Sequence, residues 1–575
     1  MIQLEINDIK INAEEGMTIL DAAKSVGISI PTLCHLKDLA PTGACRICSV
    51  EVDGQRGLVP SCAFPVYNGM VVHTNSARVR RARKTIVELL IENHPQDCLV
   101  CVRNKNCELQ DLAETYSVRE HRYVGETKSH AIDISSTSME RDPAKCILCG
   151  RCVRVCHEIQ KIGAIDFTLR GFNSIVTTPY NKGLNISDCI LCGQCILVCP
   201  TAALREKSSM KEVAAALNNK NKYTIVQVAP AVRATLGEEY NFNLGTNVTG
   251  KLVVGLKRLG FKKVFDTNFA ADLTILEEAA ELINRIKKDK PLPMFTSCCP
   301  GWVKYAEKNC PEILENISSC KSPHEMEGAV LKTYYAKKMG INPEDIFVVS
   351  IMPCTVKKYE SSRPELQEDT LPDVDAVLTT RELVRFFKLA GIDFNDLPED
   401  NFDNPLGEAT GAAAIFGTSG GVMEAAIRTA YYNLTGENLE NMELNSIRGL
   451  DGVKEATINI NGFTLNIAVI NGIGNVQPVI DDVRNGTSKY HFIEVMACPG
   501  GCINGGGQPI HQKQEKIEKR MKALYQIDSK MKHRRSHENE ALKTLYKEFL
   551  GEPNSPRSHE ILHTKYFNKK EVINT

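Results

Sequence analysis

The sequence has no excess of charge of either sign. Lys plus Arg number 69, Asp plus Glu number 70, and the pI is about 6.9. A chain with so balanced a charge has no global field that would attract nucleic acid or an anionic membrane surface. We therefore expect neither as a partner.

Long apolar runs are also missing. No run approaches the roughly 20 apolar residues that a membrane-spanning helix needs. The start, MIQLEINDIKI, alternates apolar and polar residues as a β-strand does and lacks the charged and then apolar layout of a signal peptide. We therefore expect a cytoplasmic protein without a membrane segment.

Nucleotide-binding motifs are a third absence. The chain contains neither a Rossmann GxGxxG nor a Walker motif, so we expect no nucleotide site within it. The glycine-rich NGGGQ at 504–508 follows Cys502 closely, and we interpret it as tight packing against a metal cluster held by that cysteine rather than as a phosphate loop.

Cysteine, in contrast, is abundant. The chain has 22 cysteines in 575 residues, and 15 of them lie between Cys34 and Cys199. In a reducing cytoplasm this density indicates metal ligation or redox chemistry, and the lack of a signal peptide disfavours the alternative of a secreted disulfide framework. The length predicts about three to five domains.

Two runs of four cysteines share the spacing C-x2-C-x2-C-x3-C, and Pro200 follows the second run. This repeat is typical of bacterial ferredoxins with two 4Fe-4S clusters, in which the fourth cysteine of each run serves the other cluster. We predict one cluster on Cys146, Cys149, Cys152 and Cys199 and a second on Cys189, Cys192, Cys195 and Cys156. Paired zinc knuckles are the alternative, but the crossed fourth cysteine suits a cubane better.

Four cysteines upstream predict a 2Fe-2S cluster in a strand-rich, ferredoxin-like domain: Cys34, Cys45, Cys48 and Cys62. Ten residues separate the first two, where plant-type ferredoxins have four. The longer loop resembles the N-terminal domain of the large iron–sulfur subunit of NADH dehydrogenases. A four-thiolate zinc site is the alternative.

One histidine and three cysteines lie between these groups: His94, Cys98, Cys101 and Cys107. Such a set is also a structural zinc signature, and spacing alone does not separate zinc from an N-ligated 4Fe-4S cluster. The position between two predicted cluster domains favours the cluster. The sixteen predicted ligands would thus hold four clusters in a row, which suits an electron path between two redox partners.

After about residue 208 the pattern changes to strands that alternate with helices. YTIVQVAPAVRATLGEE reads as a strand, a turn at Pro230 and a helix, and KKVFDTNFAADLTILEEAAELINRIKK reads as a strand and a helix. Alternation of this kind predicts layered α/β units with sites at the strand ends. The remaining informative cysteines fall at such ends: Cys298, Cys299, Cys354, Cys498 and Cys502.

Three segments that carry these cysteines, TSCCPGW, MPCTVKK and EVMACPGGCINGGGQ, closely resemble the signature motifs of the FeFe-hydrogenases, and the similarity extends over nearly the whole chain. The resemblance implies two α/β lobes around an active-site cluster, a 4Fe-4S cubane joined to a diiron unit with CO, cyanide and azadithiolate ligands. It implies four cubane ligands, of which Cys502 would bridge to the diiron unit: Cys299, Cys354, Cys498 and Cys502.

The resemblance also separates the two adjacent thiols. Cys299 would face the cubane, and Cys298 would pass protons to the bridgehead amine of the diiron unit. Pro300 suits the first turn of the helix PGWVKYAEKN, whose N-terminus favours nearby negative charge. A thiol with an ordinary pKa near 8.5 can exchange a proton around neutral pH. Cys310 and Cys320 we interpret as small buried apolar residues.

A buried proton donor needs a route to solvent. Glu278, Glu281 and Arg285 lie on one face of a predicted helix, which by spacing alone also fits an ordinary surface ion pair. The resemblance implies a proton relay of Cys298, Glu278, Ser318, Glu281 and Arg285. It further implies that Lys357 donates to a cyanide ligand and that three residues pack around the diiron unit: Pro230, Met352 and Met496.

The expected reaction is reversible conversion of H2 into two protons and two electrons, in which the cofactor supplies the difficult chemistry. The N-terminal modules resemble those of the catalytic (alpha) subunit of multimeric, electron-bifurcating hydrogenases more than those of stand-alone, ferredoxin-dependent enzymes. This resemblance implies as partners a flavin- and NAD-binding subunit, a small 2Fe-2S subunit, ferredoxin and the hydrogenase maturation proteins.

Two alternatives belong to other classes. SHEILHTKY contains a literal HExxH at His559, Glu560 and His563, which on a helix could bind zinc as in a metalloprotease. A non-catalytic, hydrogenase-like sensor or iron–sulfur assembly protein is the second, but we expect such a protein to lack the free or the bridging thiol, and Cys298 and Cys502 are both present.

The sequence thus predicts an α+β multidomain protein with one 2Fe-2S cluster, three accessory 4Fe-4S clusters and the active-site cluster. The expected parts are a β-grasp 2Fe-2S ferredoxin-like domain (1–78), a one-His/three-Cys module (79–120), a bacterial-ferredoxin-like two-cluster domain (137–208), a two-lobed α/β catalytic domain (209–515) and a C-terminal, small-subunit-like helical wrap (516–575).

Overall fold

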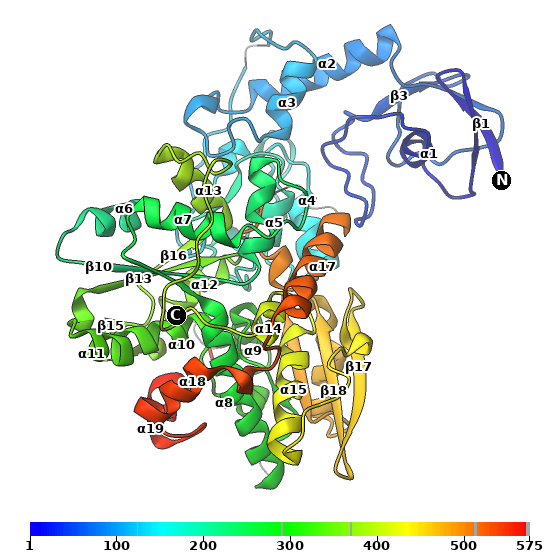
Figure 1. The fold of residues 1–575 in the computed structure, drawn as a ribbon. Coiled ribbons are helices and arrows are strands. Elements are labelled where there is room, and N and C mark those ends of the chain that lie inside the picture. The colour runs from blue at the N-terminus through cyan, green and yellow to red at the C-terminus, as the bar shows by residue number, and fades with distance from the viewer. Residues whose placement is uncertain (124, 289–290, 369–370, 511–513, 571–575) are drawn as a thin grey trace.

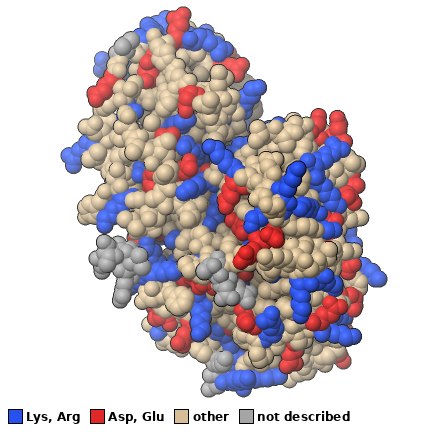
Figure 2. All heavy atoms as spheres, turned by 90° about the vertical axis from the view of Figure 1, so that its left-hand side faces the viewer, with Lys and Arg blue, Asp and Glu red and all other residues tan. Residues whose placement is uncertain are grey.

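The computed structural model describes residues 1–123, 125–288, 291–368, 371–510 and 514–570. Figure 1 shows the N-terminal sheet domain set to one side of a region that includes α2, α3, α4 and α5, with two α/β lobes below them. None of the described helices is both long and apolar enough to cross a membrane. On the face drawn in Figure 2 the basic and acidic side chains are interspersed, as the balanced composition predicts.

The N-terminal domain is a five-stranded mixed sheet of order β2-β1-β5-β3-β4 with helix α1 (Ile19–Ser25). Its strands are β1 (Ile2–Ile6), β2 (Ile9–Ala13), β3 (Ser49–Val52), β4 (Val59–Pro60) and β5 (Met70–His73). The start, expected as one alternating strand, is a hairpin, because Asn7 and Asp8 adopt φ values of 46° and 64°. Asn and Asp are the non-glycine residues that tolerate this conformation best.

A helical module follows, made of α2 (Ala77–Glu92) and α3 (Glu108–Thr115). The next domain pairs β6 (Met139–Arg141) with β9 (Leu204–Glu206) and β7 (Asp166–Thr168) with β8 (Ile175–Thr177). Its two short helices, α4 (Arg151–Arg154) and α5 (Gln194–Val198), each begin after a glycine with a φ of 71°, Gly150 or Gly193. The repeated cysteine spacing in the sequence therefore corresponds to a repeated local backbone conformation in the structure.

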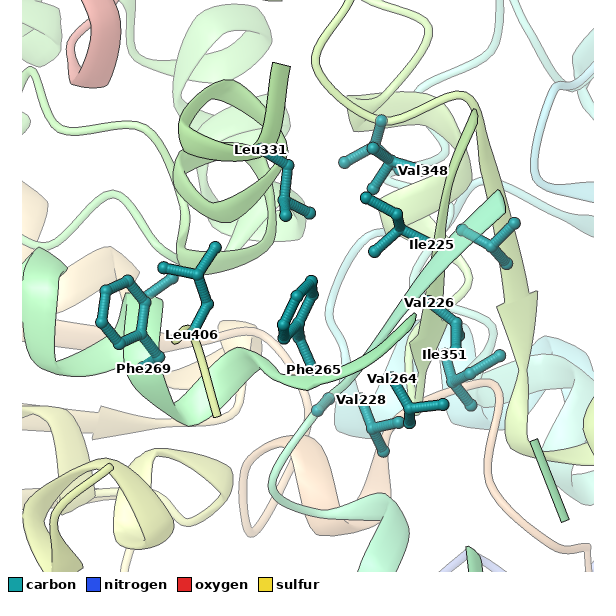
Figure 3. Close-up of a cluster of buried hydrophobic side chains, with 14 of the residues drawn as sticks. Ile225, Val226, Val228, Val264, Phe265, Phe269, Leu331, Val348, Ile351 and Leu406 are labelled. Atoms are coloured by element: carbon teal, nitrogen blue, oxygen red, sulfur yellow. The ribbon is translucent and has the colours of Figure 1, made fainter. Parts of the chain in front are cut away.

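The first catalytic lobe has a parallel sheet of order β11-β10-β13-β16. Its strands are β10 (Tyr223–Val228), β11 (Lys263–Asp266), β13 (Ile346–Met352) and β16 (Ala376–Thr379). Figure 3 shows its core, in which Ile225 and Val348 lie on the same side of the sheet as Phe265 and Leu331, and Val226, Val264 and Ile351 lie on the other side. Runs this apolar are typical of parallel strands covered on both faces.

The second lobe has a sheet of order β12-β19-β18-β17, parallel except for the β17–β18 hairpin. Its strands are β12 (Met294–Phe295), β17 (Val453–Ile460), β18 (Phe463–Asn471) and β19 (Phe492–Met496). Separate apolar clusters cover its two faces, one with α15 (Gly421–Thr435) and one with α9 (Pro300–Asn309) and α16 (Gln477–Arg484).

Helix α8 (Thr267–Lys287) contacts α15 and α10 (Pro323–Val330), and so joins the two lobes. The strand–helix order predicted for this segment is confirmed. The helix predicted after Pro230 is wrong, since the chain forms only short 3-10 turns at Val232–Ala234 and Leu236–Tyr240. The Thr235 hydroxyl bonds the carbonyls of Ala231 and Val232, which competes with a regular helix.

The C-terminal region returns over both lobes as α17 (Gln514–Lys530), α18 (Glu540–Leu545) and α19 (Pro556–Leu562), with α18 and α19 near α8 (Figure 1). Buried ion pairs anchor α17 on both sides. Arg520 lies 2.6 Å from Glu238 of the first lobe, and Asp528 lies 2.9 Å from Arg428 on α15.

Candidate functional site

Two cavities in the domain between residues 137 and 208 are each lined by four cysteines. The structure brings together the two crossed sets, Cys146, Cys149, Cys152 and Cys199 at the first cavity and Cys156, Cys189, Cys192 and Cys195 at the second. Burial, together with the negative charge of the neighbouring Cys199, raises the pKa of Cys149 to about 12. Neighbouring thiols raise one another's pKa because two thiolates repel each other. A bound cation offsets this repulsion, so the arrangement suits a site that binds a cation through thiolates.

The four cysteines of the N-terminal domain also lie together. The Cys48 and Cys62 sulfurs are 3.4 Å apart, and hydrogen bonds from Cys45 and Cys62 lower the pKa of Cys34. The Cys34 loop rests on the two-cluster domain, because the buried Arg154 guanidinium donates to the carbonyls of Cys34 and Ala40.

His94 lies at the end of α2, and its buried Nδ1 is without a hydrogen-bond partner among the described residues. Burial lowers its pKa, so the ring is neutral and can act as a ligand. Of its expected partners, Cys101 and Cys107 are half-buried and Cys98 is exposed. Ion pairs of 2.7 Å, Lys145 with Asp97 and Arg151 with Glu108, attach this module to the two-cluster domain.

Four cysteines converge between the lobes at the carboxyl ends of parallel strands. Cys299 follows β12 and is the N-cap of α9, Cys354 follows β13, and Cys498 follows β19 with Cys502 one tight loop later. Burial raises the pKa of Cys498 well above its ordinary value, and the charges that raise it further are those of Cys192, Cys354, Cys299 and Cys502. The structure therefore brings the four thiols together and places Cys192 of the second accessory set beside them.

The loop before Cys502 depends on glycine. Gly500 and Gly501 have φ values of 84° and 90°, and a Cβ on Gly501 would lie 2.7 Å from the amide nitrogen of Ser419. The NGGGQ segment packs tightly, and the atoms it packs against are backbone atoms of neighbouring segments, whereas the sequence prediction named a cluster. A Cβ on Gly506 would lie 2.3 Å from the Cys192 carbonyl oxygen.

The two adjacent cysteines have different surroundings. Cys298 belongs to a buried cluster with Phe416 and Met496, and burial raises its pKa well above the ordinary value, which keeps the thiol protonated. The Cys299 sulfur accepts the amide proton of Ala497 at 3.4 Å. Lys357 donates to the Cys298 carbonyl at 3.3 Å.

The predicted relay residues form a buried group on α8 and beside it. Glu278 is fully buried, and burial, followed by the charge of Glu281, raises its pKa to about 8. Glu281 accepts a hydrogen bond from the Ser318 hydroxyl at 2.8 Å and lies 2.7 Å from Arg285. Arg285 is itself 7% exposed. The alternative prediction of an ion pair on the surface is therefore wrong, because the pair is buried.

The three residues expected around a diiron unit also lie at strand ends. Met352 and Met496 are the last residues of β13 and β19, and each is 3% exposed. Pro230 follows β10 by two residues. All three are therefore at the edge where the four cysteines meet.

Three residues of the site were missed. Ser297 donates from its amide and hydroxyl to Glu278 at 3.4 and 3.5 Å. Glu360 holds Lys357 at 2.8 Å, and its place three residues further in MPCTVKKYE could have identified it. Gln160 donates to the Cys192 sulfur at 3.3 Å and to the Ala497 carbonyl at 3.1 Å, a contact that sequence spacing does not indicate.

The HExxH segment has no metalloprotease geometry. His563 contacts Ser319 at 2.8 Å and Glu277 at 3.1 Å, whereas Glu560 is exposed and paired with Arg557. The zinc-protease alternative is therefore wrong, because the glutamate and the second histidine face different surroundings. Cys310 and Cys320 are buried, as predicted.

The chain has several cysteine sets before residue 208 and a further set between two α/β lobes. This arrangement defines an iron–sulfur oxidoreductase with an internal catalytic cluster. The chain is 49% identical over all of both chains to the NADP-reducing hydrogenase subunit HndD of Solidesulfovibrio fructosivorans, and 45% identical to Iron hydrogenase 1 of Clostridium pasteurianum over 98% of this chain and 99% of that one. The chain belongs to the FeFe-hydrogenase family and is an iron hydrogenase, an oxidoreductase that acts on H2.

A solved structure supports the same conclusion. The apo FeFe-hydrogenase HydA1 from Chlamydomonas reinhardtii matches with a TM-score of 0.57 and 43% identity over 63% of this chain and 99% of that one. The non-catalytic alternative is therefore not retained.

Family models account for most of the chain. They are the iron only hydrogenase large subunit, C-terminal domain (222–506), the iron hydrogenase small subunit (514–569), the 2Fe-2S iron-sulfur cluster binding domain (1–77), the NADH-ubiquinone oxidoreductase-G iron-sulfur binding region (83–122) and the 4Fe-4S dicluster domain (145–203). The cofactors are thus iron–sulfur clusters of the 2Fe-2S and 4Fe-4S types and the active-site cluster, and not the zinc ions considered for the cysteine sets.

Proposed function

We propose that this chain is the H2-converting subunit of an electron-bifurcating complex that couples H2 to NAD(H) and ferredoxin. The observation that carries the proposal is the 49% identity with HndD over the full length of both chains, which includes the N-terminal domain and the His94 module. The partners would be a flavin- and NAD-binding subunit and a small 2Fe-2S subunit, with ferredoxin as the second electron carrier.

An exposed apolar surface at the His94 module supports a protein partner there. Leu99 and Val100 are 92% and 83% exposed, and they directly follow the exposed Cys98. Apolar side chains that face solvent beside a predicted cluster ligand suit a docking surface for an electron carrier.

We further propose that the cysteines and the histidine predicted from the sequence hold the clusters. We also propose the predicted division of the chain into five parts: 1–78, 79–120, 137–208, 209–515 and 516–575. Residues 511–513 and 571–575 of these parts lie outside the described residues. The convergence of the two crossed thiol sets and of the set between the lobes, together with the partnerless Nδ1 of His94, supports this assignment. The position of Cys192 beside the Cys498 set would let electrons pass to the active-site cluster.

When bound, the active-site cluster supplies the cleavage and formation of H2. The residues of this chain would exclude water and move the proton. Cys298 would exchange a proton with Glu278, which is kept protonated near neutral pH by its raised pKa of about 8. Ser318, Glu281 and Arg285 would connect Glu278 to solvent, and Lys357, held by Glu360, would present its ammonium to an anionic ligand of the cluster.

The second candidate is a stand-alone, ferredoxin-dependent hydrogenase, which the 45% identity with Iron hydrogenase 1 supports. Affinity purification of the native protein, followed by assays for bound flavin and NADH-dependent H2 turnover, separates the two. We expect copurified subunits with flavin and turnover that needs NAD(H) and ferredoxin together. A protein that purifies alone and evolves H2 from reduced ferredoxin without flavin would overturn the bifurcating proposal.

A further inference from the structure

The C-terminal region reaches the predicted proton relay through a short antiparallel contact. The amide of Lys321 donates to the Leu562 carbonyl, and the amide of Thr564 donates to the Ser319 carbonyl, each at 2.8 Å. The residue between these two bonds on the C-terminal side is His563, which is 8% exposed. The segment that holds Ser318 and Ser319 is therefore covered by the last part of the chain.

His563 joins two glutamates of α8. Its Nδ1 lies 2.8 Å from the Ser319 hydroxyl, and its Nε2 lies 3.1 Å from Glu277 Oε2. Ser319 in turn contacts Glu281 Oε2 with its amide at 3.1 Å and its hydroxyl at 3.4 Å. Glu281, Ser319, His563 and Glu277 thus form one continuous hydrogen-bonded chain.

Glu277 fixes the orientation of the ring. Burial alone would raise the pKa of this carboxyl, but hydrogen bonds from His563, Ser558 and Tyr546 lower it below the ordinary value, so Glu277 is ionised. Tyr546 donates at 2.5 Å and the Asn554 amide at 2.7 Å. An ionised Glu277 keeps the Nε2 proton of His563, which leaves Nδ1 to exchange with Ser319.

Few other groups face the imidazole. The Cys320 sulfur lies 4.0 Å from Nδ1, and the His559 ring, tilted by 39°, lies 4.1 Å from the His563 ring between centroids. Glu281, Cys320 and His563 are also residue types that bind zinc. Since both ring nitrogens and the Glu281 carboxylate already have protein partners, a proton-exchange function fits these contacts better than a metal site.

We propose that His563 acts on the relay at Glu281 through Ser319. It is a positioning residue that gives Glu281 a second route of proton exchange, called here the branch. This inference rests on the relay of the proposed function. In the protonated state His563 gives its Nδ1 proton to Ser319 Oγ, while the Ser319 hydroxyl proton passes to Glu281 Oε2. One proton moves, the imidazolium becomes neutral, and the carboxylate becomes a carboxylic acid. The two states of the branch differ only in the position of this proton.

The test compares His563→Asn and Ser319→Ala in the matured enzyme with Glu560→Gln, an exposed change on the same C-terminal segment. We expect each of the first two to lower H2 evolution by roughly tenfold on the acidic side of neutrality and by much less above it. The double variant should add nothing to either single one, and Glu560→Gln should keep the wild-type pH profile.

A second readout does not depend on turnover. Infrared spectra of the protein without the diiron unit, taken across the same pH range, should show the band of protonated carboxyl groups. In His563→Asn and in Ser319→Ala this band should change at a pH different from that in the wild type. Wild-type pH profiles and carboxyl bands in both variants would overturn the branch. If His563→Asn does not fold, Ser319→Ala decides alone. Glu281→Gln separates the two proposals, because full activity in that variant would refute the relay itself.

Discussion

The proposed catalytic site depends on two adjacent cysteines, Cys298 and Cys299, whose surroundings differ. Cys298 is enclosed by apolar side chains and stays protonated, whereas Cys299 caps α9 beside three other thiols. Cys298 lies at a bend of the chain, whereas Cys299 has extended backbone angles as the N-cap of α9. The two surroundings suit the two proposed roles, one sulfur as a cluster ligand and its neighbour as a proton donor.

We predict that Cys298→Ser retains its iron but loses H2 evolution by at least about 100-fold, because a hydroxyl is a much weaker acid than a thiol. Iron per chain and H2 evolution from a reduced dye measure the two effects. Cys310→Ser is the matched control, since Cys310 is buried away from the relay. Wild-type turnover in Cys298→Ser would exclude the thiol from proton transfer.

Glu278 gives a pH-dependent prediction. Its pKa rises from 4.5 to about 8 in the folded protein, so between these values the native state retains a proton that the unfolded chain releases. Stability from this group is complete at low pH and is lost as the pH rises toward 8. Glu278→Gln removes the effect.

The unfolding temperature of Glu278→Gln relative to wild type should therefore increase as the pH rises through that window. Thermal unfolding at several pH values measures the difference, with the exposed Glu560→Gln as control. A difference that is constant with pH would show that Glu278 is not a buried, protonated acid.

At the scale of elements, the catalytic thiols depend on where parallel strands end. β12, β13 and β19 each stop just before a ligand segment, and the strands belong to two different sheets. The carboxyl ends of parallel strands are the usual place for sites in α/β folds. The loop from Cys498 to Cys502 is the least regular part and depends most on glycine.

We predict that Gly501→Ala disrupts active-site cluster binding. The added methyl group would meet backbone atoms of Thr418 and Ser419 at 2.8 and 2.7 Å, and the φ of 90° is strained for alanine. Iron analysis and electron paramagnetic resonance should show loss of the active-site cluster with the accessory clusters retained. Gly57→Ala, whose Cβ meets nothing within 4 Å, is the control. A full complement of iron in Gly501→Ala would contradict this role.

At the scale of the whole molecule, two modules join the two-cluster domain separately. The N-terminal domain docks through Arg154, and the His94 module docks through Lys145 and Arg151. The two-cluster domain then meets the catalytic lobes where Gln160 bridges Cys192 and Ala497 and where Gly506 packs on Cys192. In the proposed electron path, both modules would therefore pass their electrons through this one junction.

We predict that Gly506→Ala slows electron transfer across this junction. Its Cβ would lie 2.3 Å from the Cys192 carbonyl oxygen and 2.6 Å from Gly193 Cα, so the two domains must separate. H2 evolution driven by ferredoxin should fall severalfold. H2/D2O isotope exchange, which needs no external electrons, should be retained. Equal losses in both assays would indicate damage to the catalytic site instead.

The sequence by itself determined the cysteine sets, the alternation of strands and helices after residue 208, and the family. These features are local, because the spacing of ligands along the chain and the period of apolar residues are set within short segments. The crossed pairing of Cys156 and Cys199 followed from the repeat. The 3-10 turns after Pro230 did not, because a side chain there competes for the backbone bonds.

Only the tertiary structure decided which distant residues support the site. His563 lies 244 residues from Ser319, and Gln160 lies 337 residues from Ala497, so no spacing in the chain relates them. The same holds for Arg154 and Cys34, which lie 120 residues apart. Burial, too, is a property of the packed molecule: Glu278 and Arg285, which helix spacing alone would leave on a surface, are 0% and 7% exposed.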